Sequence, residues 1–259
     1  MRNIMKYALS ILTALMIWGC SGCAPVHSDY RSLSTSDVSK SVFKIVANME
    51  VIAQGDETKR VINGGWSGTA WTVKVKDGNS FLMTAGHVCE SGKTYTQVGF
   101  FGDKTVYDIK SVTYKLLTPD DVTITGVTVI ADNDDDDLCL ISVAGQLGKE
   151  IPLATEDPPY AAEGYYIGAP KGIWGGGIAG YYQTHFSGRG TPFGNGKEAL
   201  AFSTASAAPG ASGSPYMYNG KAVALLNLGH GGFMTFSTGV PHEVIDAFVK
   251  KAMHVEPKE

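Results

Sequence analysis

The chain has few charged residues and little helical periodicity. Only 18% of its 259 residues are Asp, Glu, Lys or Arg, the formal charge is −4, and no basic stripe or internal repeat runs along it. It therefore lacks the clustered Lys and Arg of a nucleic-acid-binding surface. Apolar residues follow a helical spacing clearly only near the C-terminus, from about 241 to 252. The 32 Gly and 11 Pro instead favour many short strands joined by turns, so we expect an all-β fold.

Two runs show the expected strands directly. Residues 69–76 alternate between apolar and polar side chains, which predicts a half-buried strand, and Asp77-Gly78-Asn79 then predicts a hairpin turn. Residues 122–130 are rich in β-branched side chains and predict a further strand.

Cysteine is also scarce, and two of the four cysteines lie at the N-terminus. Arg2 and Lys6 precede an apolar run over 7–18, and small residues with Cys20 and Cys23 follow. A cationic start and a short apolar run are typical of an export signal and too short for a membrane span. The cysteines make this segment resemble a bacterial lipoprotein signal, in which the first mature residue is a lipid-modified cysteine.

Neither cysteine matches the lipoprotein pattern fully. Trp18 stands where that pattern prefers a small residue before Cys20, and Cys20 itself occupies the apolar position before Cys23. The alternative is ordinary secretion after cleavage. We expect a signal segment over 1–23 with lipidation at Cys20, followed by a Ser- and Thr-rich tether over 24–40. The protein would then lie on the periplasmic face of a bacterial membrane, or be secreted.

Three motifs in a particular order carry the chemistry of the chain. His87 ends the segment Thr-Ala-Gly-His, Asp137 directly precedes the apolar run 138–141, and Ser212 lies within Gly-Ala-Ser-Gly-Ser-Pro over 210–215. His, Asp, Ser is the chain order of the chymotrypsin-type triad. The α/β-hydrolases run Ser, Asp, His, and the subtilisins run Asp, His, Ser.

These residue types supply what nucleophilic catalysis needs. A Ser hydroxyl is a weak nucleophile unless a base lies within hydrogen-bond reach, and His87 is the candidate base. Asp137 would hold its tautomer and stabilise the imidazolium that forms. Glycine at 210 and 213 allows backbone conformations closed to other residues, so the amides of Gly210 and Ser212 can point together at the developing oxyanion.

Each motif alone has a simpler interpretation. Gly-x-Ser-Gly is common in loops, His87 is one of six histidines, and Asp137 closes an acidic run that reads as a solvated loop. We keep the loop interpretation for 132–136. Asp137 differs because an apolar strand follows it at once, and the three motifs in order outweigh the separate readings.

Together the motifs resemble those of the trypsin-like (chymotrypsin-fold) serine peptidases, particularly the short bacterial and viral-type members. Residues 67–73 and 81–87 look like the hairpin leading to the base, 165–170 like a strand and turn near the start of the second barrel, and 240–249 like the closing helix. The resemblance covers roughly residues 40–252. It implies two six-stranded antiparallel β-barrels with the active site between them. The implied parts are a peptidase domain over 41–252, with a first barrel over about 41–150, a second over about 151–240 and a closing helix over 241–252.

The two remaining cysteines suggest a disulfide. Cys89 follows His87 by two residues, and Cys139 follows Asp137 by two. The two segments must approach for the histidine to meet the aspartate, and an exported chain can hold a disulfide. We therefore expect a Cys89–Cys139 bond, with two buried thiols as the alternative.

The pocket for the residue before the cut is less well defined by the sequence. In the family, the position six residues before the nucleophile carries a carboxylate in trypsins, and here it is Ser206. No Asp or Glu occurs between Glu198 and Glu243, so we expect an uncharged residue before the cut. The pocket wall should include Asn227, Leu228 and Gly229. His230 lies too late to serve as the histidine that binds acidic side chains in glutamyl endopeptidases.

The favoured function is an exported serine endopeptidase that acts on protein or peptide substrates through an acyl-enzyme. It implies neither a metal nor another cofactor. A protease-fold binding protein without activity, at the cell envelope, is the alternative. An α/β-hydrolase esterase is disfavoured because the chain order is wrong and the second elbow glycine is missing.

Overall fold

The structure is a computed structural model that describes residues 38–55, 57–89, 94–98, 104–176, 179–191, 196–205, 207–229 and 235–254. At 95–98, 228 and 229 it describes the backbone alone. All of these residues belong to one compact unit, Ser34–Glu259. The expected signal segment, Cys20 and most of the expected tether lie outside the described residues.

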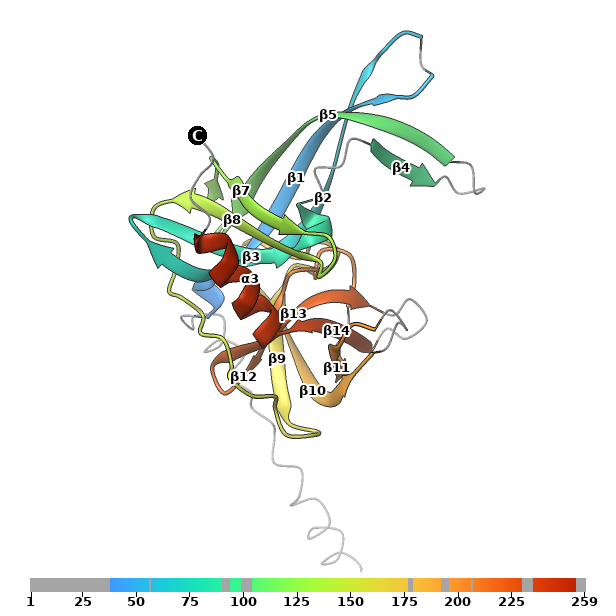
Figure 1. Cartoon of the computed structure of the whole chain (residues 1–259). Coiled ribbons are helices and arrows are strands. Elements are labelled where there is room, and N and C mark those ends of the chain that lie inside the picture. Colours follow the sequence, from blue (N-terminus) through green and yellow to red (C-terminus); the bar gives the residue numbers. More distant parts are fainter. Residues whose placement is uncertain are drawn as a thin grey trace, which may run out of the picture. The chain divides into compact units, whose positions relative to one another are not determined.

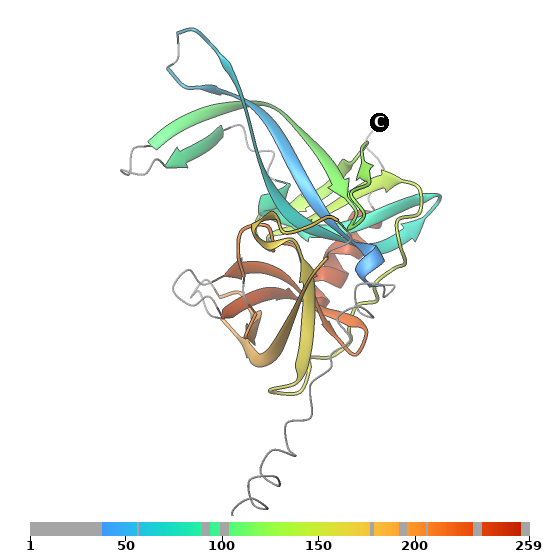
Figure 2. The ribbon, with the colours of Figure 1, turned by 180° about the vertical axis from the view of Figure 1, so that it is seen from behind.

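The first half of the unit is an antiparallel sheet with the strand order β4-β5-β1-β2-β3-β8-β7, and β6 pairs with β5 (Figure 1). Its strands are β1 (Val42–Ala53), β2 (Val61–Lys76), β3 (Asn79–Ala85), β4 (Thr94–Val98), β5 (Lys104–Leu117), β6 (Thr123–Ile124), β7 (Thr128–Asn133) and β8 (Leu138–Ala144). We expected a closed six-stranded barrel here. The sheet instead has eight strands, and its path among the described strands is open. The strands β1, β2 and β5 are the long strands of this sheet, and their ends extend beyond the other strands (Figures 1 and 2).

The second half is a closed barrel with the order β10-β11-β14-β13-β12-β9, as expected. Its strands are β9 (Glu163–Gly168), β10 (Gly180–Gly190), β11 (Ala199–Ser203), β12 (Pro215–Tyr218), β13 (Lys221–Gly229) and β14 (Phe236–Pro241). The helix α3 (His242–His254) follows, close to the bounds that the sequence predicts. Short 3-10 helices are η1 (Ser39–Ser41), η2 (Gly86–Val88) and η3 (Pro170–Gly172). The fold is all-β with one C-terminal helix.

Turn residues explain where the first strands begin and end. Asp77 and Gly78 both have a positive φ, 51° and 76°, as a two-residue hairpin turn requires, and they join β2 to β3. The run 122–130, which predicts one strand, forms two short strands instead. Gly126 has a φ of +74° between β6 and β7, which interrupts the extended backbone.

One hydrophobic cluster joins the sheet, the barrel and the helix. It contains residues from β1 to β3 and β8, such as Trp71 and Leu140, and barrel residues such as Leu225. Ile245 and Phe248 of α3 complete it, on the face that the helical spacing predicts. A second cluster fills the barrel with stacked rings, and the rings of Phe202 and Tyr216 have centroids 3.8 Å apart. The shared cluster holds the two halves together at the segments that carry the predicted site.

Candidate active site

His87 lies in the short helix η2, which directly follows β3. Ala85 ends the strand in an extended conformation, and Gly86–Val88 turn the chain so that His87 is exposed. A Cβ on Gly86 would lie 3.0 Å from the backbone of Asp137, which only a flexible neighbour could tolerate. Glycine before His87 therefore lets the two segments come into direct contact.

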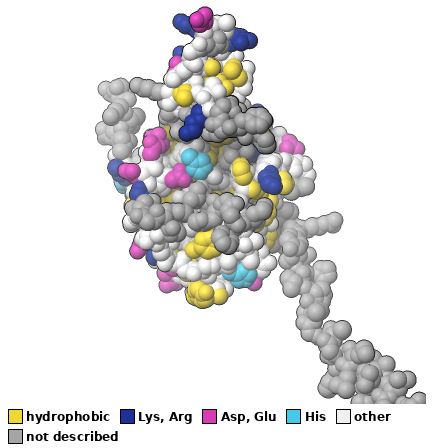
Figure 3. Space-filling model, turned by 90° about the vertical axis from the view of Figure 1, so that its right-hand side faces the viewer, with side chains coloured by type: hydrophobic (Ala, Val, Ile, Leu, Met, Phe, Trp, Pro, Cys, Tyr) yellow, Lys and Arg dark blue, Asp and Glu magenta, His cyan; other side chains and the backbone are white. Residues whose placement is uncertain are grey.

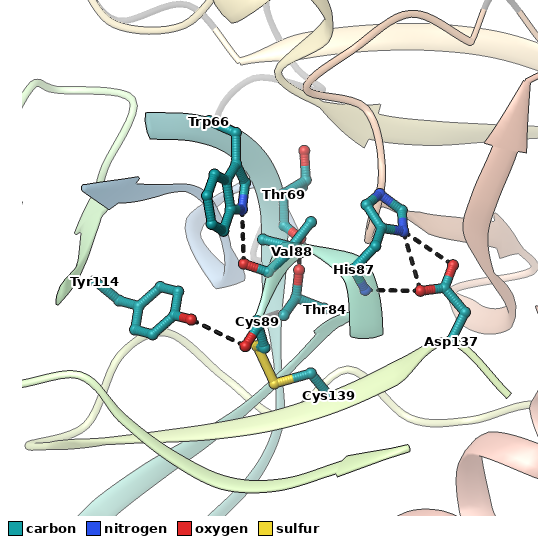
Figure 4. The surroundings of a disulfide bond; sticks show 9 residues. All are labelled: Trp66, Thr69, Thr84, His87, Val88, Cys89, Tyr114, Asp137 and Cys139. Atoms are coloured by element: carbon teal, nitrogen blue, oxygen red, sulfur yellow. Dashed lines mark hydrogen bonds and ion pairs between the residues drawn. A yellow bond between two sulfur atoms is a disulfide. The ribbon is translucent and has the colours of Figure 1, made fainter. Parts of the chain in front are cut away.

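Asp137 binds His87 through both the ring and the backbone. Its Oδ1 and Oδ2 each lie 3.0 Å from His87 Nδ1, and Oδ1 also accepts a 2.8 Å hydrogen bond from the His87 amide (Figure 4). The other ring nitrogen of His87 points away from Asp137. This geometry leaves that nitrogen accessible to a reacting group, as a general base requires.

The local backbone and exposure fit an aspartate that orients a histidine. Asp137 has a φ of 53°, a conformation that Asp adopts more readily than most residues, and it ends a turn just before β8. Its side chain is 26% exposed, and that of His87 is 47% exposed. On the face drawn in Figure 3, one histidine lies directly beside an acidic side chain at the surface.

Ser212 lies in a tight turn before β12. Gly210 and Gly213 on either side have φ values of +97° and +89°, the left-handed conformations anticipated from the sequence. A Cβ on Gly213 would lie 2.1 Å from the carbonyl oxygen of Thr69 and 3.0 Å from the amide nitrogen of Ala85. The turn is therefore packed against β2 and against the end of the strand that leads to His87.

The backbone hydrogen bonds of this turn use some of its amides and, among the described residues, leave others without an acceptor. The amides of Ala211, Gly213 and Ser214 donate to Ala208, Leu226 and Ala211, respectively. Among the described residues, the amides of Gly210 and Ser212 have no acceptor. Within that same part of the chain, no hydrogen bond joins the Ser212 hydroxyl to His87. Catalytic hydrogen bonds are often long before substrate binds, so this geometry is compatible with a resting site.

The sequence analysis did not identify Thr69, which joins β2 to the turn that carries Ser212. Its amide donates to Ser212 O at 2.8 Å and its hydroxyl donates to Gly210 O at 2.9 Å. The same hydroxyl accepts from the amide of Ala169 at 3.1 Å, and its carbonyl accepts from Thr84 Oγ1 at 2.8 Å. Thr69 is fully buried. Thr69 opens a run of alternating polar and apolar residues in which nothing sets it apart, and its partners are distant in sequence.

A disulfide braces the segments that carry His87 and Asp137. Cys89 and Cys139 are bonded, with Cα atoms 6.2 Å apart (Figure 4). The bond joins the residue directly after η2 to β8, and each cysteine lies two residues beyond its catalytic candidate. Tyr114 of β5 donates to Cys89 O at 3.0 Å. Trp66 Nε1 donates to Val88 O at 2.9 Å, so the segment after His87 is held from two strands.

The residues expected in the substrate pocket are only partly described. Ser206 lies outside the described residues, and for Leu228 and Gly229 the structure gives backbone within β13. Asn227 lies at a bulge, where the register of β13 against β14 shifts between Leu226 and Leu228. Its Oδ1 is buried and has no partner among the described side chains and backbone.

A cavity of about 450 Å³ adjoins both Asn227 and Asp137. Five of its lining residues are acidic, and Lys197 is the basic residue among those described around it. The lining consists of Asp135, Asp136, Asp137, Lys197, Glu198, Ala199, Asn227, Val240, Glu243 and Val244. These carboxylates come from outside the acid-free stretch 199–242. The sequence argument did not foresee them, because they reach this place only through folding.

A second charged group lies at the start of α3. Asp157, His242 and Glu243 lie close enough together to ligate a metal ion. Arg189 already donates to both oxygens of Asp157, at 2.7 and 2.8 Å, and also to Glu243. The Arg189 hydrogen bonds lower the pKa of Asp157 and outweigh its burial. The guanidinium therefore supplies the positive charge that a metal would bring, and the cluster is an ion-pair network.

An antiparallel sheet followed by a closed β-barrel and a C-terminal helix is the fold of the trypsin-like serine proteases. No protein-family model and no curated protein matches the sequence. Solved structures do match. The inactive mutant form of Rv3671c from M. tuberculosis has a TM-score of 0.59 at 14% identity, over 87% of this chain and 93% of that one. The HtrA-type protease AlgW, solved with a tripeptide, has a TM-score of 0.58 at 12% identity, over 86% of this chain and 63% of that one. A serine endoprotease from Yersinia pestis has a TM-score of 0.55 at 13% identity, over 86% of this chain and 66% of that one. At such identities the similarity shows the fold, and the chemistry must be argued from this chain's own residues.

Proposed function

We propose that this chain is an exported serine endopeptidase with His87, Asp137 and Ser212 as its triad. The observation that carries the proposal is the contact of Asp137 with His87 Nδ1, together with the packing of the Ser212 turn against the end of β3, the strand that leads to His87. The structural relatives include proteins described as a protease and as a serine endoprotease, which supports peptide-bond hydrolysis as the reaction.

In the proposed mechanism, Ser212 Oγ attacks the carbonyl carbon of the scissile bond. His87 Nε2 takes the hydroxyl proton, while Asp137 accepts from Nδ1–H and stabilises the imidazolium. The carbonyl oxygen becomes an oxyanion that accepts from the amides of Gly210 and Ser212. His87 then protonates the leaving amine, and the C–N bond breaks to give an acyl-enzyme. Water, deprotonated by His87, hydrolyses the ester and restores Ser212.

The substrate preference remains the one derived from the sequence. An uncharged residue before the cut is proposed because residues 199–242 carry no carboxylate. The acidic cavity beside Asn227 is the competing possibility, since it would attract a Lys or Arg side chain. A peptide library distinguishes them, because a strong preference for Lys or Arg before the cut would assign specificity to the cavity.

Export and anchoring rest on residues 1–23, with Cys20 as the proposed lipidated residue. Several acyl chains on one cysteine hold a protein stably on a membrane, whereas a single chain holds it only marginally. No helix in the described part of the chain is both long and apolar enough to cross a membrane. The proposed location is the periplasmic face of a bacterial membrane, or the exterior if the cysteine is not modified.

The test is labelling of the purified protein with a fluorophosphonate, followed by mapping of the modified residue. We expect label on Ser212, and its loss in Ser212→Ala and in His87→Ala. Ser214→Ala is the matched control, because Ser214 is a buried serine two residues away and should not react. Peptide turnover should fall by at least about 10³-fold in Ser212→Ala, and the double variant Ser212→Ala/His87→Ala should be little worse.

Two results would contradict the proposal. Near-wild-type peptide turnover by Ser212→Ala would remove Ser212 from the site. A folded wild-type protein that neither takes the label nor cleaves a peptide library would favour the protease-fold binding protein.

A further inference from the structure

Strand β2 is much longer than the neighbour on one of its sides. It pairs with β1 from Val61 to Trp71 in a continuous register without a bulge. On its other side, β3 pairs only with residues 71–76. Within the described chain, residues 61–68 of β2 therefore have no strand on their second edge, and this segment is called the open edge below.

The direction of the backbone groups on the open edge can be worked out from the register. In a regular antiparallel ladder, a residue directs its N–H and C=O to the same side, and successive residues alternate. Thr69 donates to Ser212, away from β1, so residues of the same parity also face away from β1. These residues are Ser67, Gly65, Asn63 and Val61. They present a row of peptide groups about 20 Å long.

Side-chain exposure agrees with an accessible edge. Residues 61–65 are all exposed to solvent. Val61 and Ile62 are 56% and 45% exposed, which is unusual for apolar residues of a long strand. An uncovered strand edge of this length is a template for pairing with another extended chain.

The open edge begins at the candidate active site. Thr69, two residues beyond Ser67, is bonded to the nucleophile turn. Trp66, within the edge, donates to Val88 O next to His87 (Figure 4). The expected pocket for the residue before the cut lies on β13, in the barrel, whereas the open edge belongs to the sheet. A peptide that entered the expected pocket on β13 and crossed the site would therefore leave the barrel at the cut and continue along β2.

We propose that residues 61–65, the part of the open edge beyond Ser67, bind the distal part of the substrate segment that follows the cut as an added antiparallel strand. This inference rests on the proposed peptidase function. Gly65 and Asn63 would each exchange a pair of backbone hydrogen bonds with alternate residues of that segment, beyond the contacts at Ser67. The enzyme would then act best on extended chains of about seven or more residues after the cut. Selection would be for extended, unfolded segments, because main-chain bonds carry little side-chain specificity.

The first test compares two peptides with the same sequence up to and around the cut. One ends two residues after the cut, and the other extends eight residues after it. We expect kcat/KM to be about 10- to 100-fold higher for the long peptide, mainly through KM, because several backbone hydrogen bonds are added. Equal values for the two peptides would overturn the proposal and leave the peptidase assignment intact. Cleavage of neither peptide would count against the peptidase function itself.

The second test removes one outward N–H. Asn63→Pro deletes an amide that faces away from β1, and a sheet tolerates proline on such an edge. Asn63→Ala is the matched control that keeps the amide. We expect the long-to-short ratio of kcat/KM to fall at least about fivefold in Asn63→Pro and to be retained in Asn63→Ala. A retained ratio in a folded Asn63→Pro protein would overturn the proposal.

A third measurement needs no variant. A series of long peptides, each with one N-methylated residue after the cut, should show weakened binding at every second position, since only alternate amides can pair with β2. An effect without this period of two would overturn the proposal. So would a wild-type dimer that dissociates in Asn63→Pro, because the open edge would then be occupied by a second copy of the chain.

Discussion

Replacement of Thr69 by valine tests whether the sheet holds the nucleophile turn in place. The two side chains have nearly the same shape, but valine lacks the hydroxyl that donates to Gly210 O and accepts from the Ala169 amide. Both partners are then left buried without a hydrogen bond. Each such group costs about 1–3 kcal/mol, so the loss of two should lower the free energy of unfolding by about 2–6 kcal/mol. A domain in the upper part of the ordinary range of about 5–15 kcal/mol would remain folded.

Catalysis should suffer more than stability alone explains. Gly210 supplies one of the two proposed oxyanion amides, and loss of one such donor costs about 2.7–4 kcal/mol of transition-state stabilisation. A turn that is loosened but still present should lose part of that, which predicts a fall in kcat of about 10- to 100-fold with little change in KM. Thr69→Ser is the control, because it keeps the hydroxyl and loses only a methyl group, worth about 1 kcal/mol.

The assays are denaturant unfolding for stability and peptide turnover with fluorophosphonate labelling for activity. If Thr69→Val unfolds within about 0.5 kcal/mol of the wild type and labels at the wild-type rate, the hydroxyl does not position the turn and the reasoning is wrong. The same conclusion follows if Thr69→Ser loses as much activity as Thr69→Val.

Three further predictions follow from other parts of the molecule. Arg189→Gln should lower the free energy of unfolding by about 1–2 kcal/mol near neutral pH. Arg189 depresses the pKa of Asp157 below its ordinary 3.8, so this contribution to stability is present above about pH 4 and disappears at lower pH. The acid unfolding curves of wild type and variant should therefore converge. A constant difference in stability down to about pH 2 would contradict the pairing. The Cys89–Cys139 bond spans a sequence separation of 50 residues, and its reduction should destabilise the protein by up to about 4 kcal/mol and reduce peptide turnover. Unfolding with and without reductant, compared with the Cys89→Ala/Cys139→Ala variant, measures this loss. Free thiols in protein from an oxidising compartment would reject the bond. Cys20→Ser should release the protein from the membrane fraction, whereas soluble, unmodified wild type beginning after Cys23 would remove the anchor.

The sequence by itself determined the class of fold and the identity of the candidate triad. Glycine spacing around Ser212 and the apolar run after Asp137 are local patterns, and the order of His87, Asp137 and Ser212 along the chain can be seen without the fold. The hairpin turn at Asp77-Gly78 and the helix at the C-terminus are local in the same sense, and both form as predicted. The Cys89–Cys139 pairing could be proposed because both cysteines have the same offset from residues that must meet.

Tertiary structure decided what depends on partners distant in sequence. Thr69 and Gly210 are 141 residues apart, and no local pattern shows that one hydroxyl joins them. The acidic cavity unites Asp135–Asp137 with residues from 197 to 244, so the lack of carboxylates between 199 and 242 did not describe its charge. The open edge of β2 likewise depends on where β3 stops pairing, which is a property of the sheet register. Strand identity follows from side-chain alternation within one segment, but which edges remain free follows only from how the segments assemble.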